Sequence, residues 1–108
     1  MTPARIAAAL KQLDANLMNM HGGHGAFLCC LGARKAGIPS ICTIHSLHHK
    51  WGFLSATHLI AVSEHVRHHL LSQGIRPEHI TLVRNGVDVH HFTPGDPIAA
   101  RHALKLDP

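Results

Sequence analysis

Short apolar runs alternate along the chain with segments in which apolar residues recur every three or four positions. The runs, rich in apolar and β-branched residues, predict strands at residues 16–21, 40–45, 58–62 and 80–83. The helical spacing predicts helices over residues 4–13, 25–36, 64–73 and 98–106, with a helical turn near residues 51–55. Strands that alternate with helices are typical of a parallel sheet with right-handed crossovers. We therefore predict an α/β fold, a Rossmann-like three-layer α/β/α arrangement with about four parallel strands.

Glycine, proline and serine residues mark the predicted boundaries. Gly37 is expected to end the second helix as a left-handed cap, with Pro39 close behind it. Ser63 is placed to cap the third helix, in which the acidic Glu64 opens the first turn. Asn85-Gly86 predicts a turn, because both residue types tolerate a positive φ.

Composition limits the class of protein. The chain has 108 residues, 45% of them hydrophobic, which suits one compact domain. Its net charge is +4 with the 13 histidines neutral, but the fixed charges are scattered and there is one Trp and no Tyr, so we predict no nucleic-acid partner. No stretch is long and apolar enough for a membrane span or a secretory signal. Three cysteines without C-x-x-C spacing favour a reducing compartment, and we predict a cytoplasmic location.

Candidate chemistry lies where the predicted strands end, because ligands of open parallel sheets bind beyond the carboxyl ends of the strands. His45 is the candidate catalytic residue there, through contact with the sugar or acceptor, and the candidate substrate-binding residues are Gly22, Gly23, Ser46, Arg84, Asn85 and Gly86. The glycines would let a substrate approach the backbone, and His45 would bond a sugar hydroxyl or a phosphate oxygen. The alternative is that such a histidine satisfies a local carbonyl. Ser63 lacks a G-x-S-x-G context and is better explained as a helix cap than as a nucleophile.

Paired histidines raise the possibility of a metal site. His65 and His69 have helical ligand spacing, but H-E-x-x-H is absent and no acid or cysteine is placed to complete a zinc sphere. Histidines on solvent-exposed faces explain the pattern better. We predict no metal and no cofactor.

Several segments together resemble a known enzyme family. Residues 56–64 read A-T-H-L-I-A-V-S-E, close to A-D-x-I-I-A-V-S-E, and residues 85–88 read N-G-V-D, followed by Phe92 and Pro94 as in N-G-V-D-x-x-x-F-x-P. His21-Gly22-Gly23 is similar to the end of an H-x-H-G loop, and residues 37–46 are similar to G-I-P-x-V-x-T-x-H. In this order and spacing the motifs resemble those of GT-B glycosyltransferases related to family 4.

The resemblance implies a partial N-terminal, acceptor-side Rossmann domain. Such enzymes transfer a hexosyl group, mostly with retention, from a nucleotide-sugar to a sugar or lipid-linked acceptor in a cleft between two domains, without a required metal. It implies that His45 faces the sugar, that Gly22-Gly23 lines the donor-phosphate side, and that Asn85-Gly86 lies near the cleft. Residues from about 95 to 108 would begin the linker to a C-terminal donor-binding domain. Peripheral contact with the inner membrane face would suit a lipid-linked acceptor.

Departures from the family pattern limit this expectation. Thr57 replaces the usual Asp, Asn19 stands where a His often occurs, and the loop after His45 is short. The basic pair and the E-x7-E segment that grip the donor diphosphate are absent, so we expect an acceptor-domain fragment with little or no activity alone. A stand-alone interaction module that dimerises through an open sheet edge is the first alternative, and a histidine-based metal-binding protein is the second.

Overall fold

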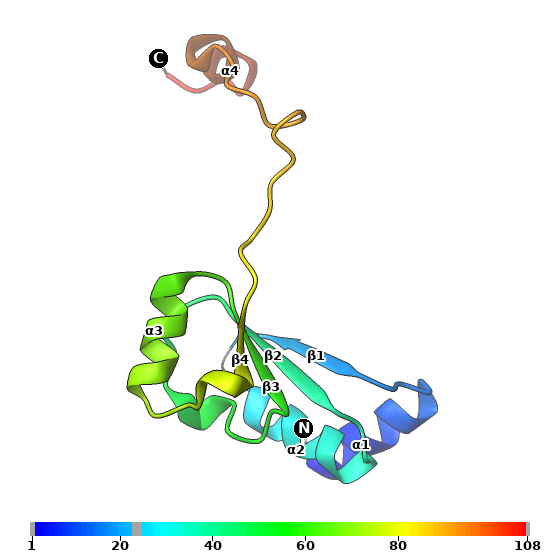
Figure 1. Cartoon of the computed structure of the whole chain (residues 1–108). Coiled ribbons are helices and arrows are strands. Elements are labelled where there is room, and N and C mark those ends of the chain that lie inside the picture. The colour runs from blue at the N-terminus through cyan, green and yellow to red at the C-terminus, as the bar shows by residue number, and fades with distance from the viewer. Residues whose placement is uncertain (1, 23–24, 108) are drawn as a thin grey trace.

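The computed structural model describes residues 2–22 and 25–107 and shows a small α/β domain with an extended C-terminal segment (Figure 1). The helices are α1 (Pro3–Gln12), α2 (Ala26–Ala36), α3 (Glu64–Ser72) and α4 (Pro97–Ala103), and the strands are β1 (Met18–His21), β2 (Ser40–Ile44), β3 (His58–Ala61) and β4 (Ile80–Leu82). Two 3-10 turns, η1 (Lys50–Gly52) and η2 (Pro77–His79), complete the order. Each predicted helix and strand is present with its bounds shifted by a few residues. Within the described ranges, no helix has the length and hydropathy needed to cross a bilayer.

The strands form one parallel sheet in the order β1-β2-β3-β4. Its register aligns Met20 with Cys42, Cys42 with Leu59, and Leu59 with Ile80. This confirms the predicted α/β class and the parallel sheet. Because all strands run in one direction, their carboxyl ends meet at a single edge.

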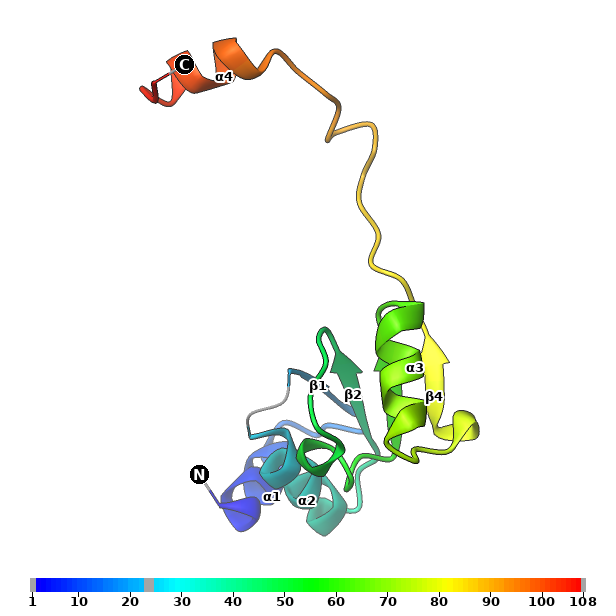
Figure 2. The ribbon, with the colours of Figure 1, turned by 90° about the vertical axis from the view of Figure 1, so that its left-hand side faces the viewer.

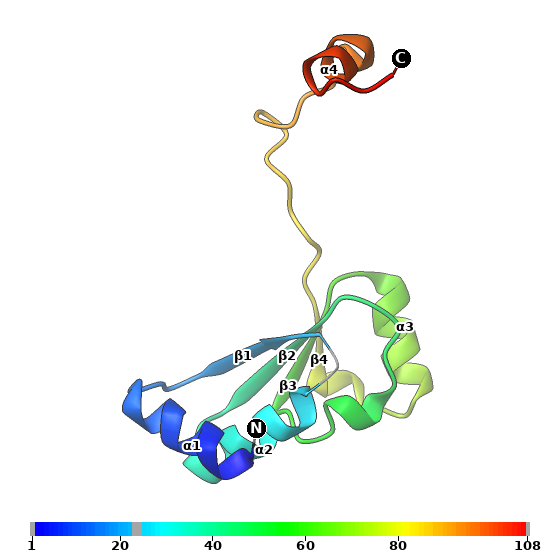
Figure 3. The ribbon, with the colours of Figure 1, turned by 180° about the vertical axis from the view of Figure 1, so that it is seen from behind.

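Helices α2 and α3 cover one face of this sheet. Strands that follow one another in chain order, joined by right-handed crossovers, place every connection on the same side. Accordingly α2 contacts β1 and β2, α3 contacts β3 and β4, and α1 packs on α2. Figure 2 shows α3 beside β4, and Figure 3 shows α1 and α2 side by side. Among the described residues the fold therefore has two layers, whereas the apolar strands predicted helices on both faces.

Side-chain burial follows this layering. Side chains such as Cys42, Ile44 and Ala61 point to the covered face and are fully buried. They pack with Phe53 from the segment before β3 and Leu70 from α3. Asn19, His21 and Thr81 have the opposite parity and are exposed. The uncovered face thus carries polar side chains between partly buried isoleucines.

The helix boundaries have the expected local causes. Gly37 ends α2 with φ +76°, as predicted for a left-handed cap. The Ser63 hydroxyl accepts a hydrogen bond from the backbone N–H of Val66 at 3.2 Å, which confirms it as the N-cap of α3.

The segment after β4 differs from the sequence prediction. Residues 83–88 run extended, and neither Asn85 nor Gly86 has a positive φ. The turn instead forms just beyond, where the Asp88 carboxylate accepts hydrogen bonds from the N–H groups of His90 and His91 at 2.9 and 3.2 Å. A short acceptor side chain that bonds the following backbone is enough to make a turn, and the predicted Asn-Gly turn was wrong. Helix α4 stands away from the sheet beyond this turn (Figure 1).

Candidate functional site

The predicted site residues follow strands that end at one edge of the sheet. Gly22 directly follows β1, His45 and Ser46 follow β2, and Arg84 comes two residues after β4. The backbone N–H of Gly22 donates to the carbonyl of Thr43 at 3.3 Å, which ties the end of β1 to β2. Gly23, predicted with Gly22, lies outside the described residues. The structure therefore places His45 and the chain end of β4 at the same edge, as the topology requires.

Two histidine rings meet at this edge. Nδ1 of His21 lies 2.9 Å from Nε2 of His45, and the rings are stacked with centroids 5.2 Å apart. The pairing arises because His21 ends β1 and His45 comes directly after the neighbouring β2. Sequence reasoning placed both residues at strand ends but did not foresee the bond, since the register that aligns the two strands is a long-range property.

A chain of hydrogen bonds fixes the protons of this histidine pair. The Thr43 hydroxyl donates to Oδ1 of Asn19 at 3.1 Å, and the Asn19 amide lies 3.3 Å from Nε2 of His21. An amide nitrogen can only donate, so Nε2 of His21 is the acceptor and its Nδ1 carries the proton. That N–H donates to Nε2 of His45, and His45 then holds its own proton on Nδ1. Asn19, which departs from the family pattern, thus becomes a positioning residue.

Gly22 leaves the backbone accessible beside the histidine pair. Its φ is +89°, and a Cβ added there would meet no atom of the described residues within 4 Å. The Cys42 thiol donates to its carbonyl at 3.7 Å. The glycine is therefore required by backbone conformation, and its part in substrate binding stays a prediction.

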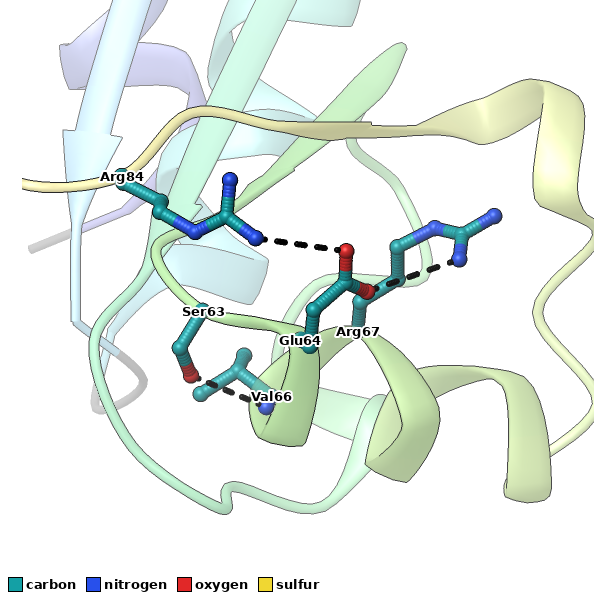
Figure 4. Close-up of polar contacts among 5 residues, drawn as sticks. All are labelled: Ser63, Glu64, Val66, Arg67 and Arg84. Atoms are coloured by element: carbon teal, nitrogen blue, oxygen red, sulfur yellow. Dashed lines mark hydrogen bonds and ion pairs between the residues drawn. The ribbon is translucent and has the colours of Figure 1, made fainter.

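Polar side chains fasten the chain after β4 to the start of α3 (Figure 4). The Glu64 carboxylate lies 3.6 Å from Nη2 of Arg84 and 3.7 Å from Nη1 of Arg67. The three side chains are 35% to 69% exposed, so each pair contributes little stability. Their effect is to hold the Arg84 guanidinium near the first turn of α3, at the carboxyl edge of the sheet.

The remaining predicted residues are less tightly gathered. The Ser46 hydroxyl lies 2.8 Å from Nε2 of His48. Asn85 and Gly86 are exposed in the extended segment, and within residues 2–22 and 25–107 no hydrogen bond joins them to His45. Their assignment to the site stays a prediction.

The buried thiols and His69 have structural roles. Burial raises the pKa of the Cys42 thiol to about 11 and also raises the pKa of Cys30, so both stay protonated at neutral pH and are poor nucleophiles. Nε2 of His69 lies 3.2 Å from the His48 carbonyl. Among the residues that the structure describes, no group of three His, Cys, Asp or Glu side chains could hold a metal ion.

Comparison with known proteins agrees with the motifs and the fold. The family described as Glycosyltransferase Family 4 matches residues 1–91, which include the sheet, the histidine pair and Arg84. No curated protein matches the chain. The match covers most of the sequence and confirms the resemblance seen in the strand-end motifs. The chain belongs to Glycosyltransferase Family 4, a GT-B family.

Proposed function

We propose that this domain forms the acceptor side of a site that transfers a hexosyl group from a nucleotide-sugar to a sugar or lipid-linked acceptor. The hydrogen-bonded pair of His21 and His45 carries the proposal. Its proton arrangement leaves an N–H on Nδ1 of His45 as a donor for a sugar hydroxyl. Gly22 adds an accessible stretch of backbone beside it.

Sugar transfer requires charge stabilisation as well as positioning, because negative charge develops on the leaving diphosphate. Arg84 is the candidate cation at the carboxyl edge, with Asn85 and Gly86 following it. One guanidinium that is already paired with Glu64 is a weak clamp for a diphosphate. We therefore propose that a donor-binding domain supplies the remaining charge and that this domain alone has little or no transferase activity.

The C-terminal segment supports this division of labour. Every residue from 83 to 107 is exposed. The apolar side chains of Ile98 and Leu104 on and after α4 are 58% and 70% exposed. A helix with unburied apolar side chains favours a role in contact with another domain. We propose that residues from about 95 lead toward the donor-binding domain.

One observation supports the alternative function. Strands β1 and β4 are edge strands, each paired with one neighbour. Unpaired backbone groups on an edge can bond a second copy of the chain. An interaction module that dimerises through this edge is the second candidate.

A binding experiment separates the two functions. Amide chemical shifts of the ¹⁵N-labelled chain would be followed by NMR during titration with methyl hexosides and with a nucleotide-sugar. The proposal expects saturable shifts at Gly22, His45 and Ser46 that His45→Ala weakens, while His102→Ala on α4 leaves them unchanged. Absence of these shifts, together with a dimer mass by light scattering, would favour the interaction module.

A further inference from the structure

A cavity lies at the opposite end of the sheet from His45. It has a volume of about 290 Å³ and is formed at the amino ends of β3 and β4, between the segment before β3 and the segment after α3. Its size is at the lower limit of small-molecule pockets. Its place at the amino ends of the strands separates it from the strand-end site. Its volume suits a compact ligand.

The base of this cavity is apolar. Phe53 and Leu59, which line it, are 1% and 4% exposed and belong to the core of the domain. Ile75 adds a partly buried side chain. Because these residues are held by core packing, the apolar base is preformed, and a ligand would not have to order it.

Basic and neutral polar residues also line the cavity. Nη2 of Arg76 lies 2.6 Å from Nε2 of His79. A guanidinium can only donate, so Nε2 of His79 accepts and the ring carries its proton on Nδ1. Arg76 and His79 together thus provide N–H donors and a fixed positive charge. His58, a further lining residue, bonds the Thr81 hydroxyl through Nε2 at 2.9 Å.

Negative charge near these residues is limited. Among the described residues that line the cavity none is acidic. Glu78 lies 3.3 Å from Nη1 of Arg76, but the two side chains are 58% and 70% exposed, so solvent screens the pair and an anion can compete with it. Thr57, which also lines the cavity, stands where the A-D-x-I-I-A-V-S-E motif has an aspartate. Its Oγ1 accepts a hydrogen bond from the N–H of Ser40 at 3.0 Å. The Thr57 hydroxyl therefore accepts this hydrogen bond without placing a negative charge at the cavity.

We propose that this cavity binds a small phosphate monoester with a compact apolar body. The body would contact Phe53, Leu59 and Ile75, and the phosphate would bind Arg76 and His79. A planar guanidinium presents paired donors that match phosphate oxygens, and the volume leaves room for about one ring. The proposal is independent of sugar transfer, because none of its residues lies at the carboxyl edge.

Phenyl phosphate is the test ligand, since it joins the two features that the cavity offers. NMR titration of the ¹⁵N-labelled chain should give saturable shifts at Gly74, Arg76 and His79, with a Kd on the order of millimolar for so small a ligand. Inorganic phosphate and phenol should each bind more weakly. Equal binding by benzoate would overturn the preference for phosphate, and absence of saturable shifts at these amides would overturn the site.

Two variants test whether the phosphate of phenyl phosphate binds beside Arg76. Thr57→Asp keeps an acceptor for the Ser40 N–H but adds a negative charge at the cavity, and Arg76→Gln removes the cation while leaving a polar side chain. Each should weaken phenyl phosphate binding about tenfold or more, the effect of losing a charge-assisted hydrogen bond. Arg34→Gln, which removes the same charge from an exposed site at the end of α2, should change the Kd less than about twofold. Equal effects of Arg76→Gln and Arg34→Gln would overturn the assignment.

Comparison of phenyl phosphate binding at the cavity with hexoside binding near His45 tests the two sites independently. His45→Ala should leave phenyl phosphate binding unchanged, whereas Arg76→Gln should leave hexoside-induced shifts at Gly22 unchanged. Failure of hexoside binding alone would contradict the proposed function and leave the cavity site standing. Loss of phenyl phosphate binding in His45→Ala would place the ligand at the strand-end site and overturn the proposal.

Discussion

The ring of His21 donates a hydrogen bond to the ring of His45 across two neighbouring strands, with 2.9 Å between Nδ1 and Nε2. The bond orients the His45 ring and leaves its Nδ1 available for the proposed sugar hydroxyl. Asn19 and Thr43 extend it into a chain that ends on the uncovered face of the sheet. The position of His45 therefore depends on side chains from both strands.

Replacement of His21 by Phe should reveal this dependence. Phe keeps the ring stacking but cannot donate to Nε2 of His45, so hexoside affinity should fall by up to about tenfold, the effect of losing one hydrogen bond. His45→Ala removes the proposed contact itself and should cost more. Both are measured by NMR titration, with circular dichroism as the check on folding. If His21→Phe binds hexosides as the unmodified chain does, the pair does not position His45.

The N-cap of α3 offers a prediction about stability. Ser63→Ala leaves the N–H of Val66 without its acceptor, and the free energy of unfolding should fall by about 1 kcal/mol. Ser46→Ala is the matched control, because Ser46 is exposed and bonds His48 outside any helix; it should change stability by less than about 0.5 kcal/mol. Urea unfolding followed by circular dichroism measures both. Equal losses in the two variants would contradict the capping role.

Local chemistry explains why much of the fold was predictable from the sequence. Gly37 and Ser63 end and begin helices through bonds to residues a few positions away, and the sequence alone contains both partners. The parallel sheet followed from the alternation of strands and helices, and its topology then placed His45 and Arg84 at one edge.

The features that sequence reasoning missed depend on distant partners or on competition between neighbours. The bond between His21 and His45 requires the register of β1 on β2, which no local pattern contains. The turn moved from Asn85-Gly86 to the residues after Asp88, because the carboxylate satisfies two backbone N–H groups there. The single layer of helices follows from the strand order rather than from the hydropathy of any one strand.

Burial of Cys42 predicts a loss of stability at high pH. The folded thiol has its pKa raised to about 11, against 9.0 without the surrounding protein. Above pH 9 the unfolded chain releases this proton while the folded chain retains it, so stability that is complete below pH 9 is lost as the pH rises toward 11. The loss should be on the order of 2 kcal/mol. Cys30, whose pKa is also raised by burial, should add to it.

Urea unfolding between about pH 8 and pH 10.5 measures this loss. Cys42→Ala removes the titrating group and should flatten the dependence, although the variant is less stable at every pH because it loses a buried side chain. A variant whose stability falls with pH as steeply as that of the unmodified chain would show that Cys42 is not the source.

The contact between α1 and α2 depends on the absence of a side chain at Gly32. A Cβ there would lie 2.5 Å from Cγ2 and 2.6 Å from Cβ of Ile6, and 3.1 Å from the carbonyl oxygen of Pro3. The branched Cβ of Ile6 cannot rotate away, so Gly32→Ala must push the two helices apart. Such overpacking costs about 1–3 kcal/mol, which exceeds the gain of roughly 1 kcal/mol from the better helix propensity of Ala. We expect a net loss of about 1 kcal/mol in the free energy of unfolding.

A double-mutant cycle isolates the clash between the two helices. Ile6→Ala alone removes a buried side chain and should cost about 2–5 kcal/mol. In that background the contact with Cγ2 is gone and only the Cβ at position 6 and the Pro3 carbonyl remain close, so adding Gly32→Ala should cost less than it does in the unmodified chain, and the two effects should not add. Gly86→Ala, at a position with no atom within 4 Å, should leave stability unchanged. Additive losses from Ile6→Ala and Gly32→Ala would mean that Ile6 is not what requires a glycine at position 32.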